Sequence, residues 1–157
     1  MITKSKQETI NLGKKIAASF KGGDIVLLEG NLGAGKTTLT KGIARYFGVK
    51  KNITSPTFSL MNVYEVKGQK SALKGIRPLA DVKSKNPKIQ NLVHVDTYRL
   101  ENENDLIEIG IEDYLGALDT ICLVEWPEKI KKLLKNKKVT SIKITHEKDN
   151  ERKIMIE

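Results

Sequence analysis

Short runs of apolar residues recur along the chain and predict the strands of a sheet. Three of these runs are almost wholly apolar, which is typical of strands buried on both faces of a parallel sheet. They are residues 24–29, 92–95 and 120–124. Residues 139–145 and 153–157 instead alternate apolar and polar positions, and Asp149–Asn150 between them predicts a hairpin turn. Residues 58–66 alternate less perfectly and predict a weaker strand.

Helical patterns lie between these strands. A first helix is expected to begin at Ser5, because Glu8 three residues later completes a capping box, and to end at Gly22–Gly23. A second helix is expected over about 36–47, directly after a glycine-rich turn. Gly48 is expected to stop it.

The second half of the chain adds shorter helical segments. Residues 101–113 predict one or two short helices broken at Gly110, and residues 128–135 predict a basic helix. The order of strands and helices predicts an α/β fold. We expect a three-layer sandwich like that of P-loop nucleoside triphosphatases, with a mainly parallel sheet and an antiparallel edge hairpin.

Length and composition fit one domain. The chain has 157 residues, enough to bury a core without disulfides or metal, so we expect a single domain over 1–157. The one cysteine, Cys122, lies in an apolar run and predicts a buried thiol. No signal peptide and no apolar run of membrane-spanning length is visible, so we expect a cytoplasmic protein without a membrane contact.

The net charge of +9 is concentrated in one segment. Residues 67–91 hold seven lysine or arginine residues against Asp81 alone, with glycine and proline but no aromatic residue. This composition is typical of a solvated loop rather than of an RNA-binding surface. We expect a basic insert at about 67–91 with little regular structure.

A glycine-rich motif follows the first buried strand. Residues 30–37 read Gly-Asn-Leu-Gly-Ala-Gly-Lys-Thr and match the P-loop pattern G-x-x-x-x-G-K-S/T at every fixed position. Its glycines let backbone N–H groups point at an anion, and the next helix adds its positive N-terminal end. Lys36 is expected to reach the β- and γ-phosphates of ATP, and Thr37 to bind Mg²⁺. The expected nucleotide-binding residues of the motif are Asn31, Leu32, Gly33, Ala34, Gly35, Lys36, Thr37 and Thr38.

Two buried strands end in a carboxylate, which a P-loop needs to hold magnesium or to polarise water. Asp96 follows residues 92–95, and Glu125 follows residues 120–124. In a parallel sheet both would lie on the P-loop side. We expect Asp96 to bind Mg²⁺ and Glu125 to orient or activate the attacking water. The reverse assignment stays open, as does a structural role for one of the two.

Three further residues have two interpretations each. Thr57, in the loop Thr54–Phe58, offers a hydroxyl to the metal or the γ-phosphate, but Ser-Pro-Thr is also a common loop sequence. Trp126 is the only tryptophan, and it is either a core anchor or a lid over the nucleotide. His94 shares a strand face with Asp96, where a structural histidine is favoured over a catalytic one.

Missing motifs narrow the class of protein. Asp96 is followed by Thr-Tyr-Arg rather than by x-x-G, and the GTPase motif N/T-K-x-D is absent, as is an ABC-type signature. A kinase would need an acceptor pocket and usually an arginine-bearing lid, to which Arg99 could contribute. An ATPase is therefore favoured. A P-loop kinase of a small metabolite and a nucleotide-gated binding module with little turnover are the alternatives.

Four motifs in order resemble one family. They are residues 30–38, 54–58, 94–100 and 123–128, and residues 108–114 match in style. Together they resemble the TsaE (YjeE) family of bacterial ATPases in tRNA threonylcarbamoyladenosine synthesis. The likeness runs from about Thr3 to Lys129, and the combination of H-x-D-x-Y-R with E-W-P-E is more specific than the P-loop alone.

This resemblance implies a partner system and a set of roles. Family members work with TsaB and TsaD, which install the threonylcarbamoyl group on adenosine 37 of tRNAs that read ANN codons. The ATPase, slow alone, is expected to reset or support that complex between turnovers and to meet tRNA through it. Motif position implies ATP and Mg²⁺ as cofactors. The implied catalytic residues are Glu125, Lys36 and Thr57, the implied metal ligands are Thr37 and Asp96, and Trp126 is implied at the nucleotide.

The basic insert departs from the family pattern. The family usually joins the strand after Thr57 to the strand before Asp96 by a short connection, whereas residues 67–91 are long here. We expect a surface excursion, and a contact with tRNA or a partner subunit is a hypothesis for it.

Overall fold

The computed structural model describes residues 1–66 and 88–157. Within these ranges seven strands form one sheet, in the order β1-β7-β6-β2-β5-β4-β3. The strands are β1 (Ile2–Thr3), β2 (Ile25–Glu29), β3 (Met61–Glu65), β4 (Asn91–Asp96), β5 (Thr120–Glu125), β6 (Val139–His146) and β7 (Arg152–Ile156). Of the predicted insert at about 67–91, only residues 88–91 are among the described residues. The last of them, Asn91, is the first residue of β4.

The four central strands are parallel and the strands outside them are antiparallel. β2 pairs in parallel with β6 and β5, and β5 pairs in parallel with β4. Every residue of β5 is buried, as expected of a strand covered on both faces. The predicted parallel centre and the antiparallel edge hairpin β6–β7 are confirmed. Antiparallel β3 completes the other edge, and the two-residue β1 was not predicted because it is too short to show a period.

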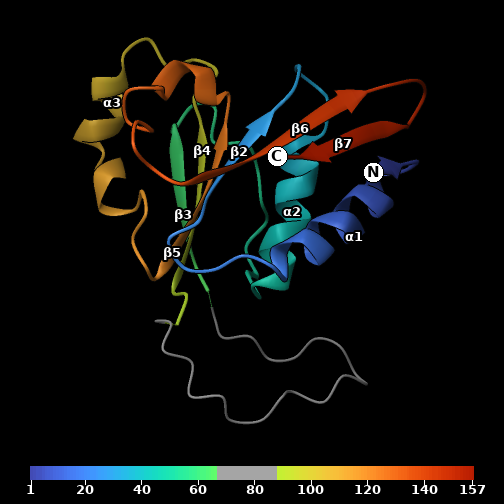
Figure 1. Ribbon diagram of the computed structural model, residues 1–157, viewed down its shortest axis with the longest axis horizontal. Coiled ribbons are helices and arrows are strands. Elements are labelled where there is room, and N and C mark those ends of the chain that lie inside the picture. Colours follow the sequence, from blue (N-terminus) through green and yellow to red (C-terminus); the bar gives the residue numbers. More distant parts are fainter. Residues whose placement is uncertain (67–87) are drawn as a thin grey trace.

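Helices cover both faces of the sheet, which confirms the three-layer sandwich (Figure 1). One face carries α1 (Lys6–Ala17) and α2 (Lys36–Tyr46), and the other carries α3 (Glu103–Glu108) with the 3-10 helices η1 (Ile111–Asp113) and η2 (Pro127–Ile130). Each face has its own apolar cluster. Leu39 and Leu123 belong to the cluster under α1 and α2, and Leu106 and Val124 to the one under α3.

Two helix boundaries follow their sequence signals. The Ser5 side chain accepts a hydrogen bond from the Glu8 N–H at 3.1 Å, as predicted. The Glu8 carboxylate accepts a hydrogen bond from the Lys4 N–H at 2.8 Å, one residue before the N–H that an ideal capping box would use. The break at Gly110 is also confirmed, because this residue has φ 81° between α3 and η1.

The basic helix predicted over 128–135 is wrong. Only η2 forms, and residues 131–136 follow as consecutive turns. Lysines three or four positions apart, such as Lys131 and Lys135, would repel one another on a helix surface. Ile130 still packs into the α3-side cluster, with Leu133 and Leu134 against it. Among all the helices that the structure describes, none combines the length and apolar character needed to cross a membrane.

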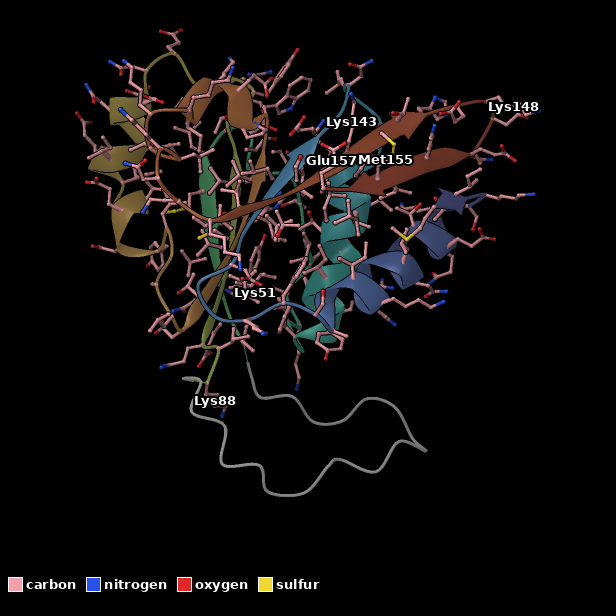
Figure 2. The ribbon with its side chains drawn as sticks, in the orientation of Figure 1. Lys51, Lys88, Lys143, Lys148, Met155 and Glu157 are labelled. Atoms are coloured by element: carbon pink, nitrogen blue, oxygen red, sulfur yellow. The ribbon has the colours of Figure 1, made fainter. Side chains whose placement is uncertain are left out.

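The β6–β7 hairpin shows the predicted alternation. Lys143 and Met155 are register partners, and both are exposed on the open face of the hairpin (Figure 2). Ile144 and Ile154, also paired, are buried under α1 and α2. The turn closes with a 2.8 Å bond from the Glu151 N–H to the Lys148 carbonyl, across the predicted Asp149–Asn150 pair.

Two glycines let α1 and α2 pack closely. A Cβ on Gly42 would lie 2.1 Å from the Ile10 carbonyl oxygen, and one on Gly13 would lie 2.5 Å from the Leu39 carbonyl oxygen. Because both obstacles are backbone atoms, a side chain there would force the helices apart. This contact holds α2, and with it the loop before α2, against α1.

We therefore expect Gly42→Ala to destabilise the fold by about 1–3 kcal/mol, although alanine is the better helix former. Urea unfolding of the two proteins would measure the difference. Lys14→Ala, an exposed change on the facing helix, is the control and should stay within about 0.5 kcal/mol of wild type. A Gly42→Ala protein as stable as wild type would contradict the close packing.

Candidate active site

The glycine-rich loop runs from the end of β2 to the start of α2 and is packed against the C-terminal hairpin. Gly30 has φ 145° and Gly35 has φ 109°, values that favour glycine. A Cβ on Gly30 would lie 2.2 Å from the Ile144 carbonyl oxygen, and one on Gly35 would lie 2.9 Å from Arg152 Nε. Backbone conformation therefore favours glycine at both positions, and the Ile144 backbone also leaves no room for a side chain at Gly30.

The backbone N–H groups at the start of α2 have no acceptor within the helix. The first α-helical bond after the loop is donated by the Leu39 N–H to the Gly35 carbonyl at 2.9 Å. The N–H groups before it have no acceptor within the helix, as at any helix N-terminus. Such groups, together with the helix dipole, form an anion site.

The Lys36 side chain is buried inside this loop. Its Nζ donates to the Gly30 carbonyl at 2.6 Å and to the Asn31 carbonyl at 3.1 Å, and it lies 4.1 Å from the centre of the Trp126 ring. Lys36 is only 4% exposed. Burial lowers its pKa below the ordinary value of 10.5, and the charge of nearby carboxylates, Glu125 foremost, opposes that lowering.

The two strand-end carboxylates lie side by side. Asp96 of β4 is the register partner of Glu125 of β5, so both acids lie at the same edge of the sheet, as the sequence predicted. Asp96 Oδ2 accepts hydrogen bonds from the Ser55 hydroxyl and, at 2.7 Å, from the Thr57 hydroxyl. Its Oδ1 accepts from the Tyr98 N–H at 3.0 Å. Asp96 therefore ties the 54–58 loop to the end of β4.

Glu125 is tied to two other elements. Its Oε1 accepts a hydrogen bond from the Thr37 hydroxyl of α2 at 3.0 Å and lies 2.9 Å from His94 Nε2 of β4. The Glu125 side chain is buried, and His94 is fully buried. The P-loop threonine thus contacts Glu125 rather than Asp96 in this conformation.

Trp126 turns the chain sharply at the end of β5. Its φ of 60° and ψ of 50° are left-handed values that L residues seldom adopt. The Thr97 hydroxyl donates to the Trp126 carbonyl at 2.5 Å and to the Glu125 carbonyl at 3.2 Å, which holds the turn. The ring packs 5.0 Å from Tyr98 and faces the Lys36 ammonium. Non-glycine residues held in this region often lie at functional sites.

These residues line one cleft of about 470 Å³. Ten of the residues singled out from the sequence are among its lining residues, and they are Leu32, Gly33, Gly35, Lys36, Thr37, Thr38, Thr57, Asp96, Glu125 and Trp126. Asn31 and Ala34 do not line it: the Asn31 carbonyl holds Lys36, and Ala34 is buried with its Cβ toward Gly30. Four further residues line the cleft. Ser55, Phe58 and Tyr98 were not singled out from the sequence, and Arg99 was considered there only as part of a kinase lid.

Each of these four residues lies close in sequence to a residue that was singled out. Ser55 and Phe58 flank the chosen Thr57, and Tyr98 and Arg99 follow Asp96 within three positions. The Arg99 guanidinium stacks 4.4 Å from the centre of the Phe58 ring, which is 84% exposed. Arg99 therefore adds a cation at the mouth of the cleft.

The residues of the cleft fit a magnesium triphosphate. Gly33, where an added Cβ would meet nothing within 4 Å, lines the cleft together with Lys36 and the first N–H-bearing residues of α2. These donors suit phosphate oxygens. Hydroxyl and carboxylate oxygens from Thr37, Asp96 and Glu125 line the same cleft, and oxygen ligands are those that Mg²⁺ prefers.

A glycine-rich loop between β2 and α2, with two strand-end carboxylates beside it, makes this a protein with the P-loop fold. Its sequence matches the profile of the family "Threonylcarbamoyl adenosine biosynthesis protein TsaE" over residues 3–154. The chain therefore belongs to the TsaE family, as the four motifs indicated.

Individual relatives agree with this assignment. The chain is 39% identical over 131 residues to the tRNA threonylcarbamoyladenosine biosynthesis protein TsaE of Rickettsia prowazekii, spanning 83% of this chain and 75% of the relative. It is 35% identical over 152 residues to the protein of that name from Bacillus subtilis, spanning 97% and 80%. The crystal structure of Bacillus subtilis YdiB matches with a TM-score of 0.70 and 30% identity, over 99% of this chain and 82% of that one.

Burial of the charged Lys36 should make the free protein less stable. Because its pKa is lowered, the folded state binds this proton less tightly than the unfolded chain does. The penalty is complete below the lowered pKa and vanishes above 10.5. We expect Lys36→Met to raise the thermal midpoint at neutral pH by about 2–4 °C, and this gain to shrink as the pH approaches the ordinary lysine value.

Scanning calorimetry between neutral and alkaline pH would measure the gain. Lys41→Met, on the same helix but outside the cleft, is the matched control and should show no pH-dependent gain. A Lys36→Met protein less stable than wild type at neutral pH would mean that the two carbonyl hydrogen bonds outweigh the burial of the charge.

Proposed function

We propose that the protein binds ATP with Mg²⁺ in this cleft and hydrolyses it in support of a TsaB–TsaD complex that modifies tRNA. The observation that carries the proposal is the convergence of Lys36, Thr37, Asp96 and Glu125 on one cleft beside the P-loop. Membership of a family named for threonylcarbamoyladenosine synthesis supplies the tRNA context. TsaB, TsaD and slow turnover come from the resemblance alone.

Each polar residue has a distinct task in the proposed reaction. The Lys36 ammonium would leave the Gly30 and Asn31 carbonyls and neutralise the β- and γ-phosphate oxygens. Magnesium, when bound, would neutralise further charge on those oxygens. Thr37 and Asp96 are proposed to hold it. The Glu125 carboxylate is proposed to orient and deprotonate the attacking water, and Trp126 to cover the nucleotide.

Thr57 is proposed to couple the metal site to its loop. Its hydroxyl and that of Ser55 both donate to Asp96, and the two hydroxyl oxygens lie 2.8 Å apart. A cation drawn to Asp96 would compete for the same carboxylate oxygen. Binding at Asp96 would thereby rearrange the 54–58 loop, which is the behaviour expected of a switch.

The reverse assignment of the acids has one contact in its favour, because Thr37 already touches Glu125. Two variants distinguish the assignments. Asp96→Asn is expected to weaken Mg²⁺-dependent nucleotide binding by about tenfold or more. Glu125→Gln is expected to bind nucleotide within about threefold of wild type but to hydrolyse it about 10²-fold more slowly.

Calorimetric titration with a non-hydrolysable ATP analogue, with and without Mg²⁺, and a phosphate-release assay would supply both quantities. Glu112→Gln makes the same carboxylate-to-amide change at an exposed position outside the cleft. This control should match wild type in nucleotide affinity and in phosphate release. If Glu125→Gln loses the magnesium dependence and Asp96→Asn keeps it, the roles of the two acids are exchanged.

The coupling role needs the partners. ATP hydrolysis and multiple-turnover tRNA modification would be measured together, with TsaB, TsaD and unmodified tRNA present or omitted. We expect both activities to rise with the wild-type protein and to collapse with Lys36→Ala, because this variant lacks the ammonium that contacts the phosphates. Lys41→Ala, five residues further along α2 and outside the cleft, should behave as wild type.

Three other results would each redirect the proposal. If the rate of ATP hydrolysis is the same with and without the partners, and tRNA modification does not change, the coupling role is wrong. Transfer of the γ-phosphate to a small molecule would identify a kinase. Nucleotide binding that supports modification without any turnover would identify a nucleotide-gated binding module.

A further inference from the structure

His94 is a buried polar residue that the proposed reaction does not yet use. It lies in β4 and is 0% exposed. Its neighbours Val93 and Val95 point into the α3-side cluster, so His94 points to the opposite face, where α2 and the P-loop lie. Among the described residues, this imidazole has one polar contact, to Glu125 Oε1 at 2.9 Å.

The register of the sheet explains this contact. His94 is paired with Leu123, which places it diagonally across from Glu125 two residues further along β5. Diagonal neighbours on one face of a sheet come within reach when one side chain is long. Because a carboxylate only accepts hydrogen bonds, Nε2 of His94 carries the proton and donates it to Glu125.

The other ring nitrogen, Nδ1, has no hydrogen-bond partner in the described part of the chain. A buried polar atom without a partner destabilises a fold, and an apolar side chain would avoid that penalty. The packing of the core therefore gives no reason for a histidine here. The contact with Glu125 is the one interaction that an apolar residue could not make.

The second oxygen of Glu125 is free to act in the cleft. Oε1 accepts from both His94 and Thr37, whereas Oε2 accepts no hydrogen bond from the described residues and is not among their buried unpartnered atoms. Glu125 lines the cleft, so Oε2 is the oxygen of this largely buried side chain that is left for chemistry there. In the proposed function Thr37 turns to the metal, so Glu125 then keeps only the hydrogen bond from His94.

We propose that His94 is a positioning residue for hydrolysis. Its Nε2–H holds Oε1 and thereby keeps Oε2 of Glu125 directed at the attacking water once Thr37 has been drawn away. This inference rests on the proposed ATP hydrolysis. It predicts different effects on the hydrolysis rate and on the nucleotide affinity, because His94 contacts Glu125 but does not line the cleft. Loss of the donor should slow the chemical step and leave nucleotide affinity nearly intact.

The test compares His94→Leu with His94→Gln in the full-length protein. Leucine removes the donor, whereas the glutamine amide nitrogen can take the place of Nε2. We expect His94→Leu to lower the single-turnover rate of ATP hydrolysis by about tenfold or more, with the affinity for a non-hydrolysable Mg–ATP analogue within about threefold of wild type. His94→Gln should restore most of the rate.

A third variant covers the case in which His94→Leu does not fold. His94→Asn places its amide nitrogen near the position of Nδ1, too far from Glu125, so it should hydrolyse ATP as slowly as expected for leucine while His94→Gln does not. Equal rates for His94→Gln and His94→Asn would overturn the positioning role. So would a parallel loss of affinity and rate, which is the result expected of a purely structural histidine.

The two proposals fail in different ways. A wild-type protein that hydrolyses ATP, together with a folded His94→Leu variant that hydrolyses it equally fast, overturns the role of His94 alone. A wild-type protein that binds the analogue but shows no hydrolysis, with or without partners, overturns the ATPase proposal and the role of His94 with it.

Discussion

The parallel pairing of β4 with β5 is the constraint on which the site depends. Its register sets Asp96 opposite Glu125 and brings His94 diagonally against the same glutamate. A slip of β4 by one residue would turn Asp96 and His94 to the α3 face, away from the P-loop and from Glu125. The pairing lies inside a sheet covered on both faces, so the apolar core that stabilises the fold also holds the register.

Two carboxylates join the elements around the cleft. Glu125 connects β5 to α2 through Thr37 and to β4 through His94, whereas Asp96 connects β4 to the loop that carries Thr57. The site also carries features that do not favour a stable fold, including the buried ammonium of Lys36 and the left-handed backbone of Trp126. Such features are expected where a protein gives up stability for function.

The fold could be predicted where a segment carries its own period or stop signal. The buried strands, the hairpin and the break at Gly110 were recovered because alternation, apolar runs and glycine are local signals. The basic helix over 128–135 was not, because like charges and packing against the α3-side cluster outweighed its helical composition. The strand β1 exists only through its pairing with β7, which no two-residue pattern can reveal.

The sequence by itself determined the P-loop, the two strand-end acids and their common edge, because motif spacing and parallel strand direction are properties of the chain order. Only the tertiary structure decided which groups touch. In the folded chain the Thr37 hydroxyl donates to Glu125, and the hydroxyls of Ser55 and Thr57 donate to Asp96. His94 contacts the same glutamate. Those contacts join residues from about 30 to 90 positions apart, so they depend on register and side-chain packing, which no local pattern encodes.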